Sequence, residues 1–368
     1  MWYTSTRGMA PRVNFEGALF SGYAPDGGLY MPEELPRLDK ETLRHWSTLS
    51  YRSLVKELCA LFVGLELIPR HDLNVEGNSD ELDEPIKAVF ADVAFVQRHN
   101  LMSLNSINWS RVLVQMAHHF FAYFQCTPSL DMHLLPTVEV VVPTGAGGNL
   151  AAGCIAQKMG LPISLVVAVN RNDIIHRTVQ KGDFSLCEVV RKTLASAMDI
   201  QVPYNMERIF WLLAGSDSQT TRALMEQFER TQSLHLPKDL HSKLSEAVTS
   251  ESVSDEAITQ TMGRCWEENQ YLLCPHSATA VSYHYQQTDS GQPSIPRCCL
   301  APASAVKFPE AVQAAGLTPE TPAEILALEH KETRCTPMRR GDDWTQMLRD
   351  TIEALSLRWK GCVENTAE

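Results

Sequence analysis

The stretch VEVVVPTGAGGNLAAG, residues Val138–Gly153, joins a run of β-branched residues to a glycine-rich turn and then to an alanine-rich segment. β-branched residues favour strands, and alanine favours helices. Three glycines in four positions let backbone N–H groups approach a ligand closely, and the N-terminus of a following helix adds positive partial charge. The pattern predicts a strand, a turn and a helix that bind an anion, most naturally a phosphate.

The sequence around this turn predicts an α/β fold with a doubly wound parallel sheet. A helix expected over residues 150–159 is followed by the apolar segment SLVVAVN at 164–170, which completes a βαβ unit. Another strand is expected at the start of RCCLAPAS, residues 297–304. Helices are expected over residues 39–67, 107–124 and most of 174–266. Only about three parallel strands are apparent, against roughly five or six in an average sheet, so the predicted sheet is incomplete.

Composition and charge exclude several classes of protein. The chain has 368 residues, of which 44% are hydrophobic, and a formal net charge of −12 without a basic stripe, so no nucleic-acid partner is expected. We expect no membrane span and no conventional secretory signal; a cytoplasmic location follows, with unconventional export left open. The cysteines form no C-x-x-C pair and the histidines lack metal-ligand spacing, so neither a disulfide framework nor a metal site is predicted.

Two common phosphate-binding motifs do not match the glycine turn. A dinucleotide-binding turn needs a small residue five positions after Gly145, but Leu150 stands there. A Walker A loop needs lysine after the second glycine of its motif, and Cys154 occupies that position after Gly153. A tight turn without any ligand remains the alternative, so the turn alone does not decide the function.

Five blocks of sequence, in order along nearly the whole chain, carry a family resemblance. They are STRG (5–8) with APDGGLYMPEELP (24–36), VEGNSDELDEPIK (75–87) with NSINWSRVLVQ (105–115), VVVPTGAGGNLAAGCIAQKMGLPI (140–163), CPHSATAV (274–281) and APASAVKF (301–308). Together they resemble the threonine synthase family of pyridoxal-phosphate (PLP) enzymes, and most closely a vertebrate threonine synthase-like group. The resemblance implies a fold-type-II, tryptophan synthase β-like architecture, with an N-terminal threonine synthase domain at 1–74 and a PLP-dependent domain at 75–368.

The resemblance also implies cofactor-binding residues. Family members commonly place a threonine hydroxyl near the pyridine ring where Pro302 stands; proline cannot donate a hydrogen bond, so Ser304 is the candidate substitute. His276 matches a Pro-His pair of the family and is a candidate for contact with substrate, the alternative being a packed, hydrogen-bonded histidine. The cofactor phosphate would be held by the backbone of Gly145, Ala146, Gly147, Gly148 and Asn149.

The implied chemistry is that of a lyase. Ala146 and Gly147 stand where true threonine synthases commonly have Asn and Phe, which weakens the case for threonine synthesis itself. The threonine synthase-like subgroup implies phosphate elimination from phosphorylated hydroxyamino acids such as phosphothreonine. The expected partner of the full-length relatives is therefore a small phosphorylated amino acid.

The Schiff-base lysine of the family has no counterpart here. The family carries it in an aromatic-Phe-Lys-Asp context before the block that begins at Val75, whereas in this chain Asn74 runs directly into Val75. The segment most similar to this lysine motif is LPKDL, which contains Lys238. Pro237 replaces the aromatic residue of the motif, and a helix N-terminus explains the segment better. We therefore predict no catalytic residue, and an internal segment missing at the 74/75 junction.

Loss of this lysine predicts a catalytically impaired phospho-lyase relative that binds PLP weakly and non-covalently. Missing strands would also expose sheet edges and apolar surface, so low stability is expected. Two alternatives stay open: a non-catalytic interaction or signalling protein with a protein partner, and a residual enzyme that uses a substitute lysine.

Overall fold

The computed structural model describes residues 1–62, 74–75, 79–99, 101–128, 135–291, 295–318, 321–331 and 336–364. The strands are β1 (Tyr3–Ser5), β2 (Tyr30–Pro32), β3 (Asn74–Val75), β4 (Val138–Pro143), β5 (Ile163–Val169), β6 (Val248–Ser252), β7 (Arg297–Cys299) and β8 (Pro337–Met338). The described residues also form the short 3-10 helices η1 (Ser196–Met198), η2 (Ala305–Lys307) and η3 (Ala327–His330). The α-helices are α1 (Phe15–Leu19), α2 (Lys40–Ser47), α3 (Tyr51–Ala60), α4 (Ser79–Ala91), α5 (Val93–His99), α6 (Trp109–Cys126), α7 (Gly148–Lys158), α8 (Ile174–Lys181), α9 (Met206–Leu213), α10 (Ser218–Thr231), α11 (Lys238–Ala247), α12 (Asp255–Asn269), α13 (Pro275–Asp289), α14 (Pro309–Ala314), α15 (Ala323–Leu326) and α16 (Trp344–Glu364).

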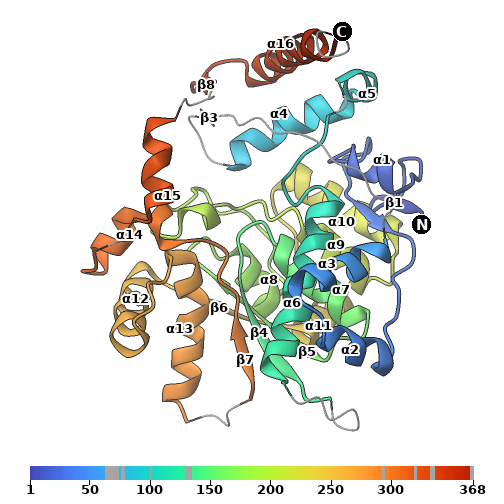
Figure 1. Cartoon of the computed structure of the whole chain (residues 1–368). Helices are drawn as coiled ribbons and strands as arrows, with labels where there is room; N and C mark the ends of the chain where they lie inside the picture. The colour runs from blue at the N-terminus through green and yellow to red at the C-terminus, as the bar shows by residue number, and fades with distance from the viewer. Residues whose placement is uncertain are drawn as a thin grey trace.

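In the described part of the chain, a parallel sheet of four strands forms the centre of the molecule. Its order is β6-β5-β4-β7, and every neighbouring pair is parallel. Figure 1 shows this sheet with helices on both sides, which is the doubly wound arrangement predicted from the sequence. The strand-turn-helix-strand unit from β4 to β5 is confirmed, as is the strand at β7.

Side chains that alternate along each strand pack against different helices. Val140 and Val142 of β4 belong to the main core with α6 and α7. Val141 and Val166 belong to a separate cluster with Ala280 of α13, on the other face. Full burial of each valine stabilises the fold by roughly 1.5–3 kcal/mol. The uniformly apolar strands are thus explained by burial on both faces of the sheet.

The first part of the chain packs beside this sheet. β1 and β2 form an antiparallel pair, and α3 packs along α6.

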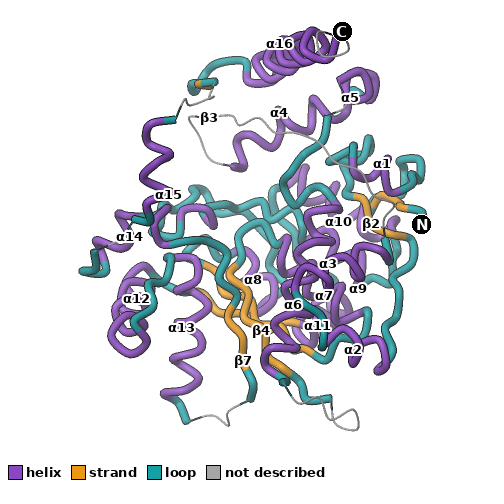
Figure 2. The backbone as a smooth tube through the Cα atoms, in the orientation of Figure 1, coloured by secondary structure: helices purple, strands orange, loops and turns teal. Residues whose placement is uncertain are grey.

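Figures 1 and 2 show α4, α5 and α16 together at one end of the molecule, away from the sheet. The short parallel pair β3–β8 joins the same layer. This layer combines segments that are far apart in the sequence.

Two of the regions predicted to be helical are interrupted in the structure, and a third helix begins where it was predicted. The region 174–266 is not all helix: β6 lies within it as an edge strand, and most of residues 183–201 form irregular structure. The helix expected over 39–67 is two helices, α2 and α3, separated at residues 48–50, and 63–67 lie outside the described residues. Pro237 occupies the N-cap position of α11, which begins at Lys238 as expected.

Candidate functional site

The glycine turn lies at the carboxyl end of β4, directly before α7. Gly147 is the N-cap residue of α7 and has a φ of 80°, in the left-handed region that favours glycine. The predicted position between a parallel strand and a helix N-terminus is confirmed. This is the edge of a parallel sheet at which ligands of α/β proteins commonly bind.

The backbone N–H groups at this turn have no acceptor among the described residues. The first backbone hydrogen bond of α7 runs from the N–H of Ala151 to the carbonyl of Gly147, at 2.9 Å. The N–H groups of residues 145–150 therefore donate to no described acceptor. Gly147 and Gly148 are buried. Because buried N–H groups are nearly always hydrogen-bonded, consecutive unpaired donors at a helix N-terminus fit an anionic ligand such as a phosphate.

Close packing requires glycine at two of the turn positions. A Cβ atom on Gly145 would lie 3.0 Å from the Cα atom of Met198 and 3.3 Å from the carbonyl oxygen of Ala197. A Cβ atom on Gly148 would lie 2.5 Å from the Cβ atom of Ser106. The turn is therefore held between the segment before α6 and the segment that contains η1.

We expect the Gly148→Ala substitution to destabilise the protein by about 1–3 kcal/mol, because Ser106 would have to move to accept the new methyl group. The measurement is urea denaturation. The matched control is Gly263→Ala within α12, where an added Cβ has no neighbour within 4 Å. This control should stabilise the protein by about 0.5–1 kcal/mol through helix propensity. Equal effects at both positions would contradict the packing described here.

His119 of α6 holds Asn149 in place. Its Nε2 atom lies 3.0 Å from both the backbone oxygen and the side-chain oxygen of Asn149, so Nε2 carries the hydrogen and donates. The ring is fully buried, and burial lowers the pKa of His119 to about 4. A neutral histidine thus fixes the amide of Asn149, with the NH₂ group directed away from the ring.

His276, at the start of α13, is packed and hydrogen-bonded. Its ring lies 4.5 Å from that of Phe308, and its Nε2 atom accepts a hydrogen bond of 3.1 Å from the backbone N–H of Ala197. Burial, with a smaller contribution from the charge of Lys307, lowers the pKa of His276 to about 4. Because Ala197 also covers Gly145, His276 supports the wall of the turn. Its contact with substrate stays a prediction.

Ser304 lies apart from this network. It is exposed and caps η2, where its hydroxyl accepts from the N–H of Val306 at 3.4 Å. Among the described residues no hydrogen bond joins Ser304 to the glycine turn. Its role near a pyridine ring stays a prediction.

Sequence reasoning missed a residue that binds the turn directly. Asn205 donates to the Ala146 carbonyl twice, from its backbone N–H at 3.2 Å and from Nδ2 at 3.0 Å. Nδ2 also donates to the Ser106 hydroxyl at 2.9 Å. Asn205 and Ser106 are 99 residues apart in the chain, so no local pattern could have revealed the pairing.

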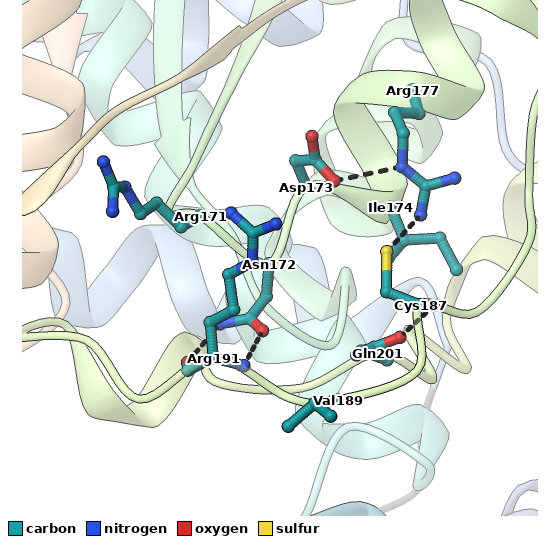
Figure 3. A pocket seen from close by; sticks show the side chains of 9 residues that line it. All are labelled: Arg171, Asn172, Asp173, Ile174, Arg177, Cys187, Val189, Arg191 and Gln201. Atoms are coloured by element: carbon teal, nitrogen blue, oxygen red, sulfur yellow. Dashed lines mark hydrogen bonds and ion pairs between the residues drawn. The ribbon is translucent and has the colours of Figure 1, made fainter.

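A concavity beyond β5 is lined by three arginines, Arg171, Arg177 and Arg191 (Figure 3). Its volume is about 20 Å³, which is room for about one water molecule. Arg177 is already engaged by Asp173 at 3.0 Å and Asp183 at 2.6 Å. The glycine turn, whose N–H groups have no acceptor in the described part of the chain, is therefore the stronger anion site.

The described residues contain neither a membrane-spanning helix nor a metal-binding cluster. None of the helices is both long and apolar enough to span a membrane. No group of three or more His, Cys, Asp or Glu side chains has a metal-binding arrangement in the same part of the chain.

Comparison with known proteins gives consistent matches. The family descriptions "Threonine synthase N terminus" and "Threonine synthase, C-terminal" match residues 2–76 and 277–352. Threonine synthase-like 2 of Rattus norvegicus is 76% identical over 485 aligned residues, with 100% of each chain covered. The 485 aligned positions exceed the 368 residues of this chain by 117, so the alignment contains gaps in this chain.

Solved structures also match. The crystal structure of threonine synthase from yeast is 25% identical, with a TM-score of 0.80, and the match covers 96% of this chain and 98% of that one. A PLP-bound threonine synthase from Brucella melitensis is also 25% identical, with a TM-score of 0.79 and coverage of 97% and 99%. The sequence matches and the structural matches are thus both to threonine synthases and threonine synthase-like proteins.

Proposed function

Because this chain belongs to the threonine synthase family, we propose that it binds PLP through the cofactor phosphate at Gly145–Asn149 but lacks the lysine that its catalytic relatives need. The observation that carries the proposal is the run of backbone N–H groups at residues 145–150 without acceptors among the described residues. These donors and the N-terminus of α7 suit a phosphate dianion.

The described residues around the turn do not provide the amine that would bind the aldehyde of PLP covalently. PLP in this class of enzyme requires an amine within bonding reach of its aldehyde. The atoms nearest to the glycines of the turn, together with the partner of Asn149, belong to Ser106, Gln115, His119, Ala197, Met198, Asn205 and Met206, and none of these is a lysine. These residues support phosphate binding and offer no amine for the chemical step.

We place the missing lysine segment at the junction of Asn74 and Val75. The excess of 485 aligned positions over 368 residues supports an internal gap of about the size of several strands and helices. For relatives that retain this segment, we propose phosphate elimination from phosphorylated hydroxyamino acids of the phosphothreonine type. For this shortened chain we propose a severely impaired form of that activity.

PLP added to the protein should bind reversibly, because only the phosphate contacts remain. We expect inorganic phosphate to compete with it, dialysis to remove it, and pyridoxal, which lacks the phosphate, not to bind. Borohydride treatment followed by peptide mapping should reveal no stoichiometric pyridoxyl-lysine, and phosphothreonine should release at most traces of phosphate. One dominant labelled lysine, together with phosphate release that is lost when that lysine becomes alanine, would overturn the proposal of an impaired enzyme.

A non-catalytic interaction protein is the second candidate. Exposed apolar side chains on α15 and η3 favour it, since Ile325, Leu326 and Leu328 are 44%, 47% and 52% exposed. A specific protein complex that loses affinity when these three residues become serine, in a protein that binds neither PLP nor phosphate, would select this candidate.

A further inference from the structure

Arg208 of α9 is fully buried and contacts only neutral groups among the described residues. Its guanidinium donates to the backbone oxygens of Ser106 at 2.6 Å and Ile107 at 2.7 Å, and to Oδ1 of Asn205. The carboxylate of the neighbouring Glu207 is bound by Arg7 and acts on Arg208 through its charge without a direct contact. Burial lowers the pKa of Arg208 to about 10, so it still carries its charge at neutral pH. A buried positive charge without a carboxylate partner is costly unless an anion compensates it.

Arg208 also determines how the amide of Asn205 is oriented. A guanidinium can only donate hydrogen bonds, so the Asn205 atom that faces it must be the oxygen. The NH₂ group of Asn205 then faces the Ala146 carbonyl, which can only accept, at 3.0 Å. The two contacts are consistent with a single amide orientation, and both side chains are fully buried.

Because Asn205 binds the carbonyl of Ala146, it also sets the direction of the Gly147 N–H group. The peptide between Ala146 and Gly147 is trans, and in a trans peptide the C=O and N–H bonds point in opposite directions. With the Ala146 oxygen held by Asn205, the Gly147 N–H must point away from Asn205. That N–H is one of the donors without an acceptor among the described residues.

We propose that Arg208 and Asn205 are positioning residues for a phosphate-monoester site at the glycine turn. Asn205 aims the Gly147 N–H at the ligand, and Arg208 orients Asn205 and supplies a buried positive charge that the phosphate dianion compensates. The inference rests on the proposed function, since it assumes that a phosphate group occupies the turn.

The test is the Asn205→Asp substitution. An aspartate keeps the size of the side chain and the contact with Arg208. Its negative charge compensates the charge of the guanidinium, and its second oxygen faces the Ala146 carbonyl, where the amide had an NH₂ group. We expect affinity for inorganic phosphate and for PLP, measured by calorimetry, to fall about 10- to 100-fold. The melting temperature should change by only a few degrees, because the introduced carboxylate gains an ion pair with Arg208.

The matched control is Asn269→Asp at the exposed C-terminal end of α12, which adds the same charge at a residue that makes no described contact with the turn. It should leave phosphate affinity unchanged. A purely structural role for Asn205 would lower the melting temperature and leave the phosphate affinity of the folded protein intact. That result would overturn the positioning role.

A measurement on the unmodified protein covers the case in which the variant does not fold. With glycine labelled by ¹⁵N, the Gly147 amide should shift and exchange more slowly as inorganic phosphate is added. If phosphate binds and this amide does not respond, the positioning inference is wrong while the proposed function stands. If neither phosphate nor PLP binds the unmodified protein, the proposed function fails and the inference fails with it.

Discussion

Lowering the pH from 7 to about 4 is expected to remove about 6 kcal/mol of folding free energy through two buried histidines. The pKa values of His119 and His276 are each about 4 in the folded protein, against 6.5 for an ordinary histidine. As the pH falls, the unfolded chain takes up these protons first. The stabilisation is thus fully present above pH 6.5 and is lost progressively between pH 6.5 and 4.

Urea denaturation at several pH values between 7 and 4.5 would measure this loss. His119→Gln retains an N–H donor for Asn149, and His276→Gln retains an acceptor for the Ala197 N–H, yet neither glutamine titrates. Each substitution should remove about half of the pH dependence, and the double variant should remove most of it. Carboxylates with lowered pKa values, such as Asp183, lose their contribution mainly below this window. A double variant as sensitive to pH as the original protein would refute the assignment.

The Glu207→Ala substitution is expected to destabilise the protein by about 3–5 kcal/mol, because it leaves a buried arginine without its main partner. Arg7 and Glu207 are 6% and 3% exposed and form an ion pair of 3.1 Å. Glu207 also accepts a 2.6 Å hydrogen bond from Thr6, so it joins the N-terminal segment to α9. Thermal and urea denaturation would measure the change.

Glu229 offers a matched control, since it pairs with the same arginine at 2.8 Å but its side chain is 44% exposed. Glu229→Ala should cost about 1 kcal/mol or less, because solvent screens the exposed pair. Replacing Arg7 and Glu207 together by methionine and leucine should restore part of the stability lost in Glu207→Ala. Equal losses from Glu207→Ala and Glu229→Ala would show that burial does not govern this pair.

Local sequence patterns were enough to predict the strand, turn and helix at Val138–Lys158, because β-branched, glycine and alanine residues each favour one conformation there. β6 was missed because its sequence, VTSES, is polar and belongs to an edge strand with less apolar burial. The prediction of a parallel sheet was nevertheless correct, since buried strands β4 and β5 determine its centre.

The glycine turn itself could be predicted from the sequence, but its supports could not. Ser106, Asn205 and Arg208 meet only because helices far apart in the chain pack together. In the sequence His119 is notable only for lacking metal-ligand spacing, and its contact with Asn149 depends on how α6 packs on α7. Such long-range polar contacts leave no periodic signal in the sequence.

The layer formed by α4, α5 and α16 affects how the chain folds during synthesis. Arg349 of α16 binds Asp92 at 3.0 Å across 257 residues of sequence, and β3 pairs with β8 over a similar span. α4 and α5 leave the ribosome long before their partners exist, a delay of tens of seconds at roughly 5–20 residues per second. During that interval the apolar side chains of Val89 and Phe95 lack Met338 and Leu348, the other two buried residues of their cluster. The nascent chain should therefore depend on chaperones until the last helix has been synthesised.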